Sequence, residues 1–356
     1  MDALNPGFTL IEGDHTLSSD DLRPDGESVV EVAKTGVKGV VAALLGTGDV
    51  FVVRDASVPL PQVAEDKVWL QTSGTTGAPK WVGHSRDRLK ARIRAGGDRA
   101  RWLLTFHPGS FAGLQVILTA MAGGHILIAP GHGASIADLA DLAVAEQATH
   151  ISGTPTFWRA FLMALGDRSL PLKSVTLGGE AADQTLLDAV KARFPQAHLR
   201  HIYATTEAGT VFSVQDGLAG FPRDWLNDDL SVTEQETLEV KGLDTGDIVE
   251  LTPNRVLFRG RRDAMVNVGG VKVYPEAVES CLLELSFIQD VRVSARPNPI
   301  TGHVLVADIV LKPDSGFDEA QIKAHLQGLP RAQRPVSLRY VDALDISATG
   351  KKSRSV

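Results

Sequence analysis

The sequence predicts an α/β protein with a large N-terminal domain, in which helices cover mainly parallel sheets, and a small C-terminal α+β domain. Three observations predict this class. Apolar strand-like segments alternate with helical ones from residue 68 to residue 203, turn residues dominate 212–244, and a shorter mixed pattern follows residue 263. We expect the first domain over 1–260 and the second over 261–356, with a hinge near Asp263.

The large domain is predicted from strand and helix pairs. Residues 1–66 are weakly patterned, and their one apolar segment, 37–45, fits either a helix or a strand. Beyond it the pattern predicts strands at 102–106, 125–129, 149–152, 174–177 and 199–203, and helices at 114–121, 136–145, from 155, and at 183–194. Thr154 suits the N-cap before Pro155. Such alternation implies a parallel sheet, and ligands bind where its strands end.

The remaining segments predict a change of architecture. Residues 248–251 and 256–258 fit an antiparallel hairpin, and the polar run 259–263 is interpreted as a linker. A helix from 275, strands at 291–295 and 304–311, a helix at 318–326 and a strand at 337–341 complete the small domain.

Composition excludes several classes of protein. The 356 residues carry 36 Lys and Arg against 43 Asp and Glu, and a net charge of −7 argues against a nucleic-acid binder. One cysteine, Cys281, excludes an intrachain disulfide framework and suggests a reducing compartment. The start of the sequence lacks the pattern of a secretion signal, and the apolar runs are too short to span a bilayer. We therefore expect a cytoplasmic protein without a membrane partner.

A nine-residue stretch rich in hydroxyl groups is the strongest functional signal. It reads Thr72-Ser73-Gly74-Thr75-Thr76-Gly77-Ala78-Pro79-Lys80. Hydroxyl and cationic donors with glycines suit the oxygens of a phosphate. Because an apolar run precedes it and Ser85 is a plausible N-cap after it, we expect the stretch to link a strand to a helix. The spacing does not fit a P-loop, and the alternative is a turn that binds no ligand.

This stretch resembles the signature loop of the adenylate-forming superfamily, which includes acyl- and aryl-CoA synthetases, adenylation domains and luciferases. Further motifs of that family follow in order along the chain. They are Gly178-Gly179-Glu180, Tyr203-Ala204-Thr205-Thr206-Glu207, Thr245-Gly246-Asp247, the segment from Gly260 to Glu276 with Arg261, Asp263, Gly269 and Gly270, and Lys351 near the C-terminus. The resemblance covers about residues 68–354.

The resemblance implies a role for each motif. The loop 72–80, Gly179 with Glu180, and the segment 203–206 would contact ATP, with Tyr203 stacked on adenine. Glu207 would hold Mg²⁺, Asp247 and Arg261 would bind the ribose, and Gly269 and Gly270 would line a CoA channel. Lys351, Thr76 and Glu207 are the predicted catalytic residues. The small domain would swing about Asp263 between two reaction poses.

These roles predict an AMP-forming ligase that activates an aryl or acyl carboxylic acid as an acyl-adenylate and transfers it to CoA. ATP, Mg²⁺ and CoA are the implied cofactor and co-substrates. An adenylation enzyme that loads a carrier-protein thiol or another nucleophile is one alternative, and a non-catalytic homologue that acts as an ATP-binding or scaffold protein is the other. The region before the signature loop is shorter than in the family, and Trp81, Arg86 and the run 110–114 depart from its pattern near the acyl pocket.

Overall fold

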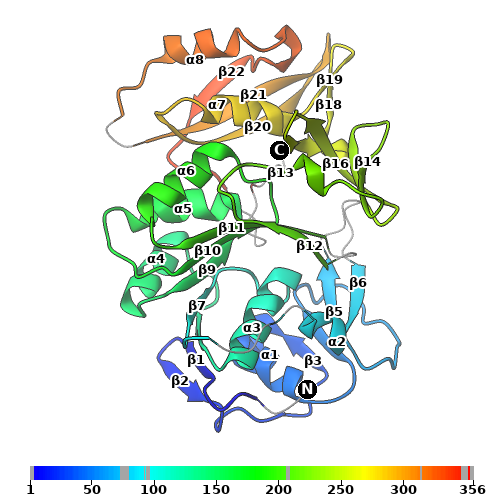
Figure 1. Ribbon diagram of the computed structural model, residues 1–356, viewed down its shortest axis with the longest axis vertical. Coiled ribbons are helices and arrows are strands. Elements are labelled where there is room, and N and C mark those ends of the chain that lie inside the picture. The colour runs from blue at the N-terminus through cyan, green and yellow to red at the C-terminus, as the bar shows by residue number, and fades with distance from the viewer. Residues whose placement is uncertain are drawn as a thin grey trace.

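The computed structural model describes residues 4–72, 80–91, 93, 97–205, 209–312, 315–345 and 352. In these ranges two mainly parallel sheets form a large domain, followed by an antiparallel sheet and then by a small C-terminal domain, at the top of Figure 1. The predicted fold class is confirmed.

The largest sheet has the strand order β12-β11-β10-β9-β7-β8-β1-β2. Its six central strands are parallel, and β12 and β2 run antiparallel at the two edges. The strands are β1 (Thr9–Glu12), β2 (His15–Ser18), β7 (Arg101–Leu104), β8 (Ile126–Ala129), β9 (His150–Gly153), β10 (Ser174–Gly178), β11 (His198–Thr205) and β12 (Gly209–Val214).

Both faces of this sheet are buried, as its apolar strands require. Trp102 and Leu104 pack into a core with α1 (Val32–Leu45) and α3 (Phe111–Gly123), whereas Leu103 packs on the other side. Three helices cover that other side, as Figure 1 shows: α4 (Ile136–Ala145), α5 (Pro155–Leu165) and α6 (Gln184–Arg193). The Thr154 side chain accepts a hydrogen bond from the backbone of Phe157 (3.0 Å), so the predicted N-cap is confirmed.

A second sheet carries the two strands that flank the signature loop. Its order is β3 (Val29–Glu31), β4 (Val50–Val53), β5 (Lys67–Thr72) and β6 (Lys80–Ser85). Because β5 and β6 pair antiparallel, with Thr72 opposite Lys80, the loop joins two strands, and the prediction of a strand followed directly by a helix was wrong. Ser85 does cap a helix, α2 (Arg86–Lys90), but only after β6 has ended.

The antiparallel sheet has the order β13-β17-β16-β15-β14. Its elements are β13 (Phe221–Pro222), a 3₁₀ turn (Arg223–Trp225), β14 (Leu230–Val232), β15 (Thr237–Val240), β16 (Leu243–Leu251) and β17 (Arg255–Arg261). The predicted hairpin is present as β16 and β17. Residues 259–261, however, belong to β17 and are not a linker, because Gly260 and Arg261 pair with Ile248 and Asp247 of β16.

The small domain has its own apolar core. Its elements are a 3₁₀ turn (Arg262–Ala264), β18 (Val266–Val268), β19 (Val271–Val273), α7 (Pro275–Leu283), β20 (Ile288–Asn298), β21 (Gly302–Leu311), α8 (Glu319–Leu326), a 3₁₀ turn (Arg331–Gln333) and β22 (Ser337–Tyr340). Val278 and Leu282 of α7 pack there against Val291 of β20 and Ile309 of β21, and all four are fully buried. No helix within the described ranges is long and apolar enough to cross a membrane.

One buried histidine links this core packing to pH. His84 on β6 is fully buried against Phe111, with 5.2 Å between ring centroids, and no described residue is a hydrogen-bond partner of either ring nitrogen. Burial, with a smaller contribution from the charge of Arg88, lowers the pKa of His84 to about 4. The unfolded chain therefore binds a proton that the folded chain does not, between about pH 6.5 and pH 4.

We therefore predict that His84→Leu weakens the acid sensitivity of the fold. The stabilisation from a neutral buried His84 is present above its unfolded pKa and is lost as pH falls toward the folded value, which contributes roughly 1–3 kcal/mol. Urea unfolding at pH 8 and pH 5 measures the loss, which should be smaller in His84→Leu than in the wild type. Substitution of the exposed His303 by Leu is the control, and an unchanged loss in His84→Leu would contradict the assignment.

Candidate active site

Two of the predicted loops lie at the same edge of the large sheet. β10 and β11 are parallel neighbours with Gly178 beside Ile202, so the segments that leave their carboxyl ends are adjacent. Gly179 and Glu180 directly follow β10, and Ala204 and Thr205 are the last two residues of β11. The Glu180 carboxylate accepts a hydrogen bond from the backbone of Thr156 (3.0 Å), so it is held against the first turn of α5.

Asp247 binds two other residues that are predicted to contact the nucleotide, Tyr203 and Arg261. Its Oδ2 accepts a hydrogen bond from the Tyr203 hydroxyl (2.5 Å), and its Oδ1 lies 3.1 Å from Nη1 of Arg261. Tyr203 lies on β11 of the large sheet, whereas Asp247 and Arg261 face each other across β16 and β17. The site is thus formed where the parallel sheet meets the antiparallel sheet.

Arg261 also reaches the predicted hinge. Its Nε and Nη2 donate to the two carboxylate oxygens of Asp263 at 2.9 and 3.2 Å, and this pairing raises the pKa of Arg261. A second pair, Arg262 with Asp244 (2.6 Å), lies on the same two segments and lowers the pKa of Asp244. Arg261 therefore remains cationic next to its acceptor groups.

The Tyr203 ring is held by two phenylalanines. It stacks against Phe212 of β12 and Phe258 of β17, with centroid separations of 5.2 and 5.1 Å. Burial, and then the charge of Asp247, raises the pKa of Tyr203, so its hydroxyl stays protonated and acts as a donor. Part of the ring surface that the resemblance assigns to adenine is already covered by aromatic side chains.

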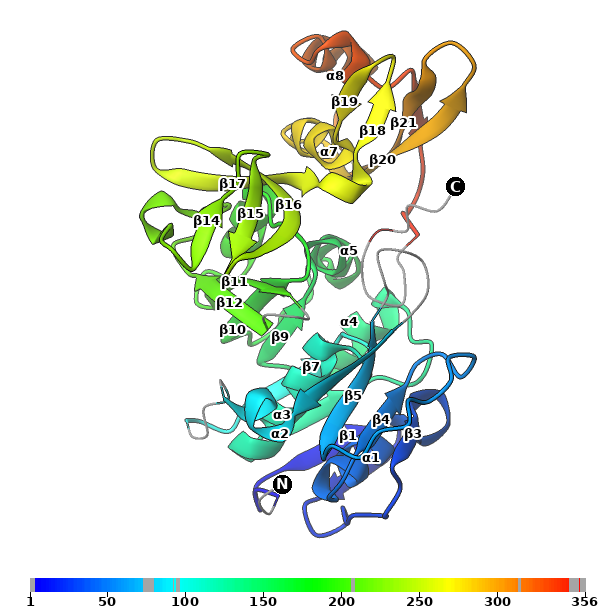
Figure 2. The same ribbon diagram turned by 90° about the vertical axis from the view of Figure 1, so that its right-hand side faces the viewer.

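Gly269 and Gly270 form the two-residue turn between β18 and β19. Both have positive φ angles, 58° and 86°, as tight hairpin turns of this type require. Figures 1 and 2 both place this hairpin on the part of the small domain that lies away from the large parallel sheet. The backbone conformation by itself accounts for glycine at these two positions.

Several predicted site residues lie outside the described residues. These are Ser73, Gly74, Thr75, Thr76, Gly77, Thr206, Glu207 and Lys351. The described structure reaches the signature loop only at its two ends, Thr72 of β5 and the exposed Lys80 of β6. Within the ranges given above, no three His, Cys, Asp or Glu side chains gather closely enough to hold a metal ion.

Sequence reasoning missed the side chains that hold the site together. Phe212 and Phe258 stack on Tyr203, and Asp263 binds Arg261 in addition to its predicted role as the hinge. Phe258 ends a short apolar run, 256–258, that predicts a strand, but nothing local predicts which ring it meets. The contact joins residues 55 positions apart, 203 and 258.

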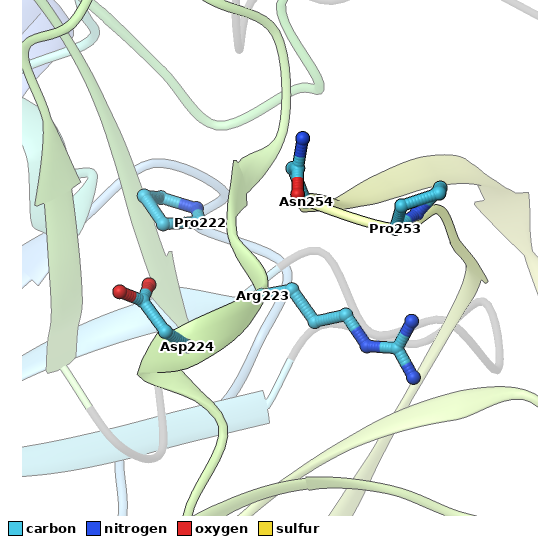
Figure 3. A pocket seen from close by; sticks show the side chains of 5 residues that line it. All are labelled: Pro222, Arg223, Asp224, Pro253 and Asn254. Carbon is cyan, nitrogen blue, oxygen red and sulfur yellow. The ribbon is translucent and has the colours of Figure 1, made fainter.

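A surface hollow lies elsewhere on the antiparallel sheet. It has a volume of about 480 Å³ and is lined by Pro222, Arg223, Asp224, Pro253 and Asn254, which Figure 3 shows. The Arg223 guanidinium donates to the backbone of Thr252 (3.0 Å), and Figure 3 shows it directed away from Asp224. No residue of the predicted site lines this hollow, so it is not the active-site candidate.

Comparison with known proteins identifies the family. Residues 14–248 match the model of the AMP-binding enzyme family, and residues 277–351 match the AMP-binding enzyme C-terminal domain. The chain therefore belongs to the AMP-binding enzyme family, which confirms the resemblance found in its motifs.

Individual relatives are distant. A 2-succinylbenzoate–CoA ligase of Oceanobacillus iheyensis is 24% identical over 80% of this chain and 68% of its own length. An isonitrile lipopeptide synthase of Streptomyces coeruleorubidus is 27% identical over 80% of this chain, which spans only 23% of that protein. The chain spans 10% of an N-(5-amino-5-carboxypentanoyl)-L-cysteinyl-D-valine synthase of Amycolatopsis lactamdurans and 5% of tyrocidine synthase 3 of Brevibacillus parabrevis.

Solved structures share the fold over nearly the whole chain. The anthranilate CoA ligase AuaEII, in complex with anthranoyl-AMP, has a TM-score of 0.67 at 17% identity and covers 99% of this chain and 93% of its own. The o-succinylbenzoate CoA synthetase of Bacillus subtilis, in complex with OSB-AMP, has a TM-score of 0.62 at 17% identity, over 98% and 94%. At these identities the match shows the fold alone.

We predict that Gly260→Ala destabilises the junction that carries Arg261. Gly260 has a φ of 142°, and an added Cβ would lie 2.9 Å from Oε2 of Glu276 and 3.4 Å from Cβ of Tyr274. The expected cost is about 1–3 kcal/mol of unfolding free energy, measured by thermal and urea unfolding. Gly316→Ala is the control, because no atom lies within 4 Å of its added Cβ. Equal stability of the two variants would show that the junction tolerates a side chain.

Proposed function

We propose that this chain is an ATP-dependent, AMP-forming ligase that activates a carboxylic acid as an acyl-adenylate and transfers the acyl group to CoA. The observation that carries the proposal is the convergence of Tyr203, Asp247 and Arg261, from three separate segments, on one hydrogen-bonded cluster. Membership of the AMP-binding enzyme family makes a nucleotide the natural ligand of that cluster.

The donor and acceptor groups suit the sugar of a nucleotide. A carboxylate offers about four lone-pair positions, and Tyr203 and Arg261 use only two of those on Asp247. The remaining positions accept both ribose hydroxyls without loss of the existing partners. Arg261, held by Asp263, adds a fixed cation next to the sugar.

The chemistry requires positive charge at the reacting phosphorus. A carboxylate oxygen of the acid attacks the α-phosphorus, the bond to the β-phosphate breaks, and pyrophosphate leaves. Both reactants are anionic, so Lys351 and the donors of the loop 72–80 lower the barrier by preorganised attraction. Glu207 would hold Mg²⁺, which would supply charge neutralisation for the pyrophosphate.

In the second step a thiol sulfur attacks the acyl carbonyl, and AMP leaves with the electrons of the acyl–oxygen bond. We assign the CoA thiol as the acceptor and the hairpin at Gly269 and Gly270 as the wall of its channel. In the described structure this hairpin lies away from the large sheet (Figure 2), so this step requires the small domain, 261–356, to rotate about Asp263.

A carrier-protein thiol is the second candidate for the acceptor. A 3,4-dihydroxybenzoate–[aryl-carrier protein] ligase of Bacillus anthracis is 33% identical over 28% of this chain and 23% of its own length. CoA is favoured because the 2-succinylbenzoate–CoA ligase matches in sequence over 80% of this chain and 68% of its own length. Incubation with ATP, Mg²⁺ and a panel of aromatic and aliphatic acids, with either CoA or a carrier protein, separates the two by mass spectrometry of the thioester.

The primary test is acid-dependent exchange of pyrophosphate into ATP. We predict exchange with at least one acid of the panel, and a fall of about 10²–10³-fold in Lys351→Ala, because a fixed cation at the developing charge is lost. A native protein that neither binds ATP nor supports exchange would instead be a non-catalytic scaffold.

A separate prediction concerns the ribose. Asp247→Ala should weaken ATP binding about 10–100-fold in calorimetric titration, because it removes the acceptor of both hydroxyls and leaves the Tyr203 hydroxyl without its partner. Asp216→Ala is the control, since that carboxylate pairs with Arg255 on the same pair of sheets but outside the cluster. Equal affinity in Asp247→Ala and the control would remove Asp247 from the nucleotide site.

A further inference from the structure

A chain of buried charges crosses from the large domain to the small domain. In the large domain, Arg159 of α5 forms an ion pair with Asp183, the N-cap of α6. Nε of Arg159 also lies 3.8 Å from Oδ1 of Asp290, which belongs to β20 of the small domain. Beside this contact, the side-chain amide nitrogen of Gln289 lies 3.5 Å from the backbone oxygen of Arg159.

The same Asp290 carboxylate binds Lys352. Nζ of Lys352 lies 2.8 Å from Oδ1 of Asp290 and 3.7 Å from Oε2 of Glu279 on α7, and it donates to the backbone oxygen of Val291 at 2.6 Å. The side chains of Arg159, Asp290, Glu279 and Lys352 are each less than 10% exposed. Charges are removed from water to this extent only when partners surround them.

From these contacts we propose that Asp290 is a positioning residue for adenylate formation. It ties Lys352 to β20, and it ties β20 to α5 through Arg159. Lys352 directly follows the predicted catalytic Lys351 in the sequence. A side chain fixed at three oxygen atoms restricts the adjacent backbone, and therefore the approach of Lys351 to the reacting phosphate. The inference rests on the proposed function.

The contact between Arg159 and Asp290 can break and form again without leaving a cation unpaired. When the domains separate, Arg159 keeps Asp183, and Lys352 keeps Asp290 and Glu279, so each side retains a partner for its cation. Of the contacts named here, the 3.8 Å contact between Arg159 and Asp290 and the Gln289 contact are lost. The contact between Arg159 and Asp290 thus favours one pose of the small domain and still allows the other.

The test separates the two half-reactions. In Asp290→Asn, which keeps the size of the side chain, pyrophosphate exchange should fall about 10–100-fold, as for a misplaced catalytic group. Thioester formation from a supplied acyl-adenylate should change less than about threefold, because it does not use this pose. Lys352→Met should behave like Asp290→Asn, and Lys352→Arg should recover most of the exchange. An equal fall in both half-reactions would indicate a general structural defect and overturn the proposal.

The control is Lys323→Met. Lys323 pairs with Glu319 on the surface of the same domain, and its side chain is 65% exposed. This variant should leave both half-reactions unchanged. A comparable loss of exchange in Lys323→Met would show that Lys352 has no special role.

A second readout does not depend on activity. Acetylation of the wild-type protein with a lysine-specific reagent, followed by mass spectrometry, should modify Lys352 at least about tenfold more slowly than Lys323, because burial limits access. Asp290→Asn should remove much of this protection. Equal rates at the two lysines in the wild type would overturn the proposal. If the wild type exchanges no pyrophosphate with any acid, the proposed function fails, whereas the acetylation rates still decide whether the contact exists.

Discussion

The site depends on the Asp247 carboxylate, which joins the large parallel sheet to the antiparallel sheet. One oxygen is bound by Tyr203 from the edge of the parallel sheet, and the other by Arg261 from the antiparallel sheet. The positions are set by strand pairing: Asp247 lies directly opposite Arg261 in the β16–β17 ladder. Cross-strand partners point to the same face, so the ladder brings the carboxylate and guanidinium together without help from a loop.

Both partners of this carboxylate, Tyr203 and Arg261, are protonated donors. The pKa of Tyr203 is raised by burial and by Asp247, and the pKa of Arg261 is raised by Asp263. Both groups are therefore donors at any pH near neutrality. Phe212 and Phe258 fix the plane of the Tyr203 ring, so the direction of its hydroxyl is also set before a ligand arrives. Preorganised donors of this kind need no rearrangement during a reaction.

The sequence predicted best the elements in which the apolar pattern repeats several times and capping residues mark the ends. The helix expected at 136–145 has those bounds in the structure, because Ser135 and Asp138 form a reciprocal capping box around its first turn. It did less well at 1–66, where strands of three and four residues supply too few alternations to detect. After the signature loop the helix capped by Ser85 is present, but the strand β6 before it was not predicted, and there Trp81 and Val82 pair with β5.

The chemistry-bearing residues of the site were recognisable from motifs, but their connections were not. Local sequence predicts that Asp247 follows a turn glycine, and nothing local predicts that its carboxylate meets Tyr203, 44 positions earlier. The same holds for the aromatic rings around Tyr203. Contacts between residues so far apart in the sequence depend on how two sheets pack, and the periodic pattern of apolar residues does not predict that packing.

The charged contact at the domain boundary fits the proposed rotation of the small domain. An apolar boundary would expose surface to water at a cost of about 25 cal/mol per Å² whenever the domains separate. The charges at Arg159 and Asp290 instead gain hydration on separation, which offsets the attraction that they lose. Since Asp183 and Lys352 stay with their own domains, neither side is left with an isolated buried charge. A boundary built in this way favours one pose and still leaves a second pose accessible.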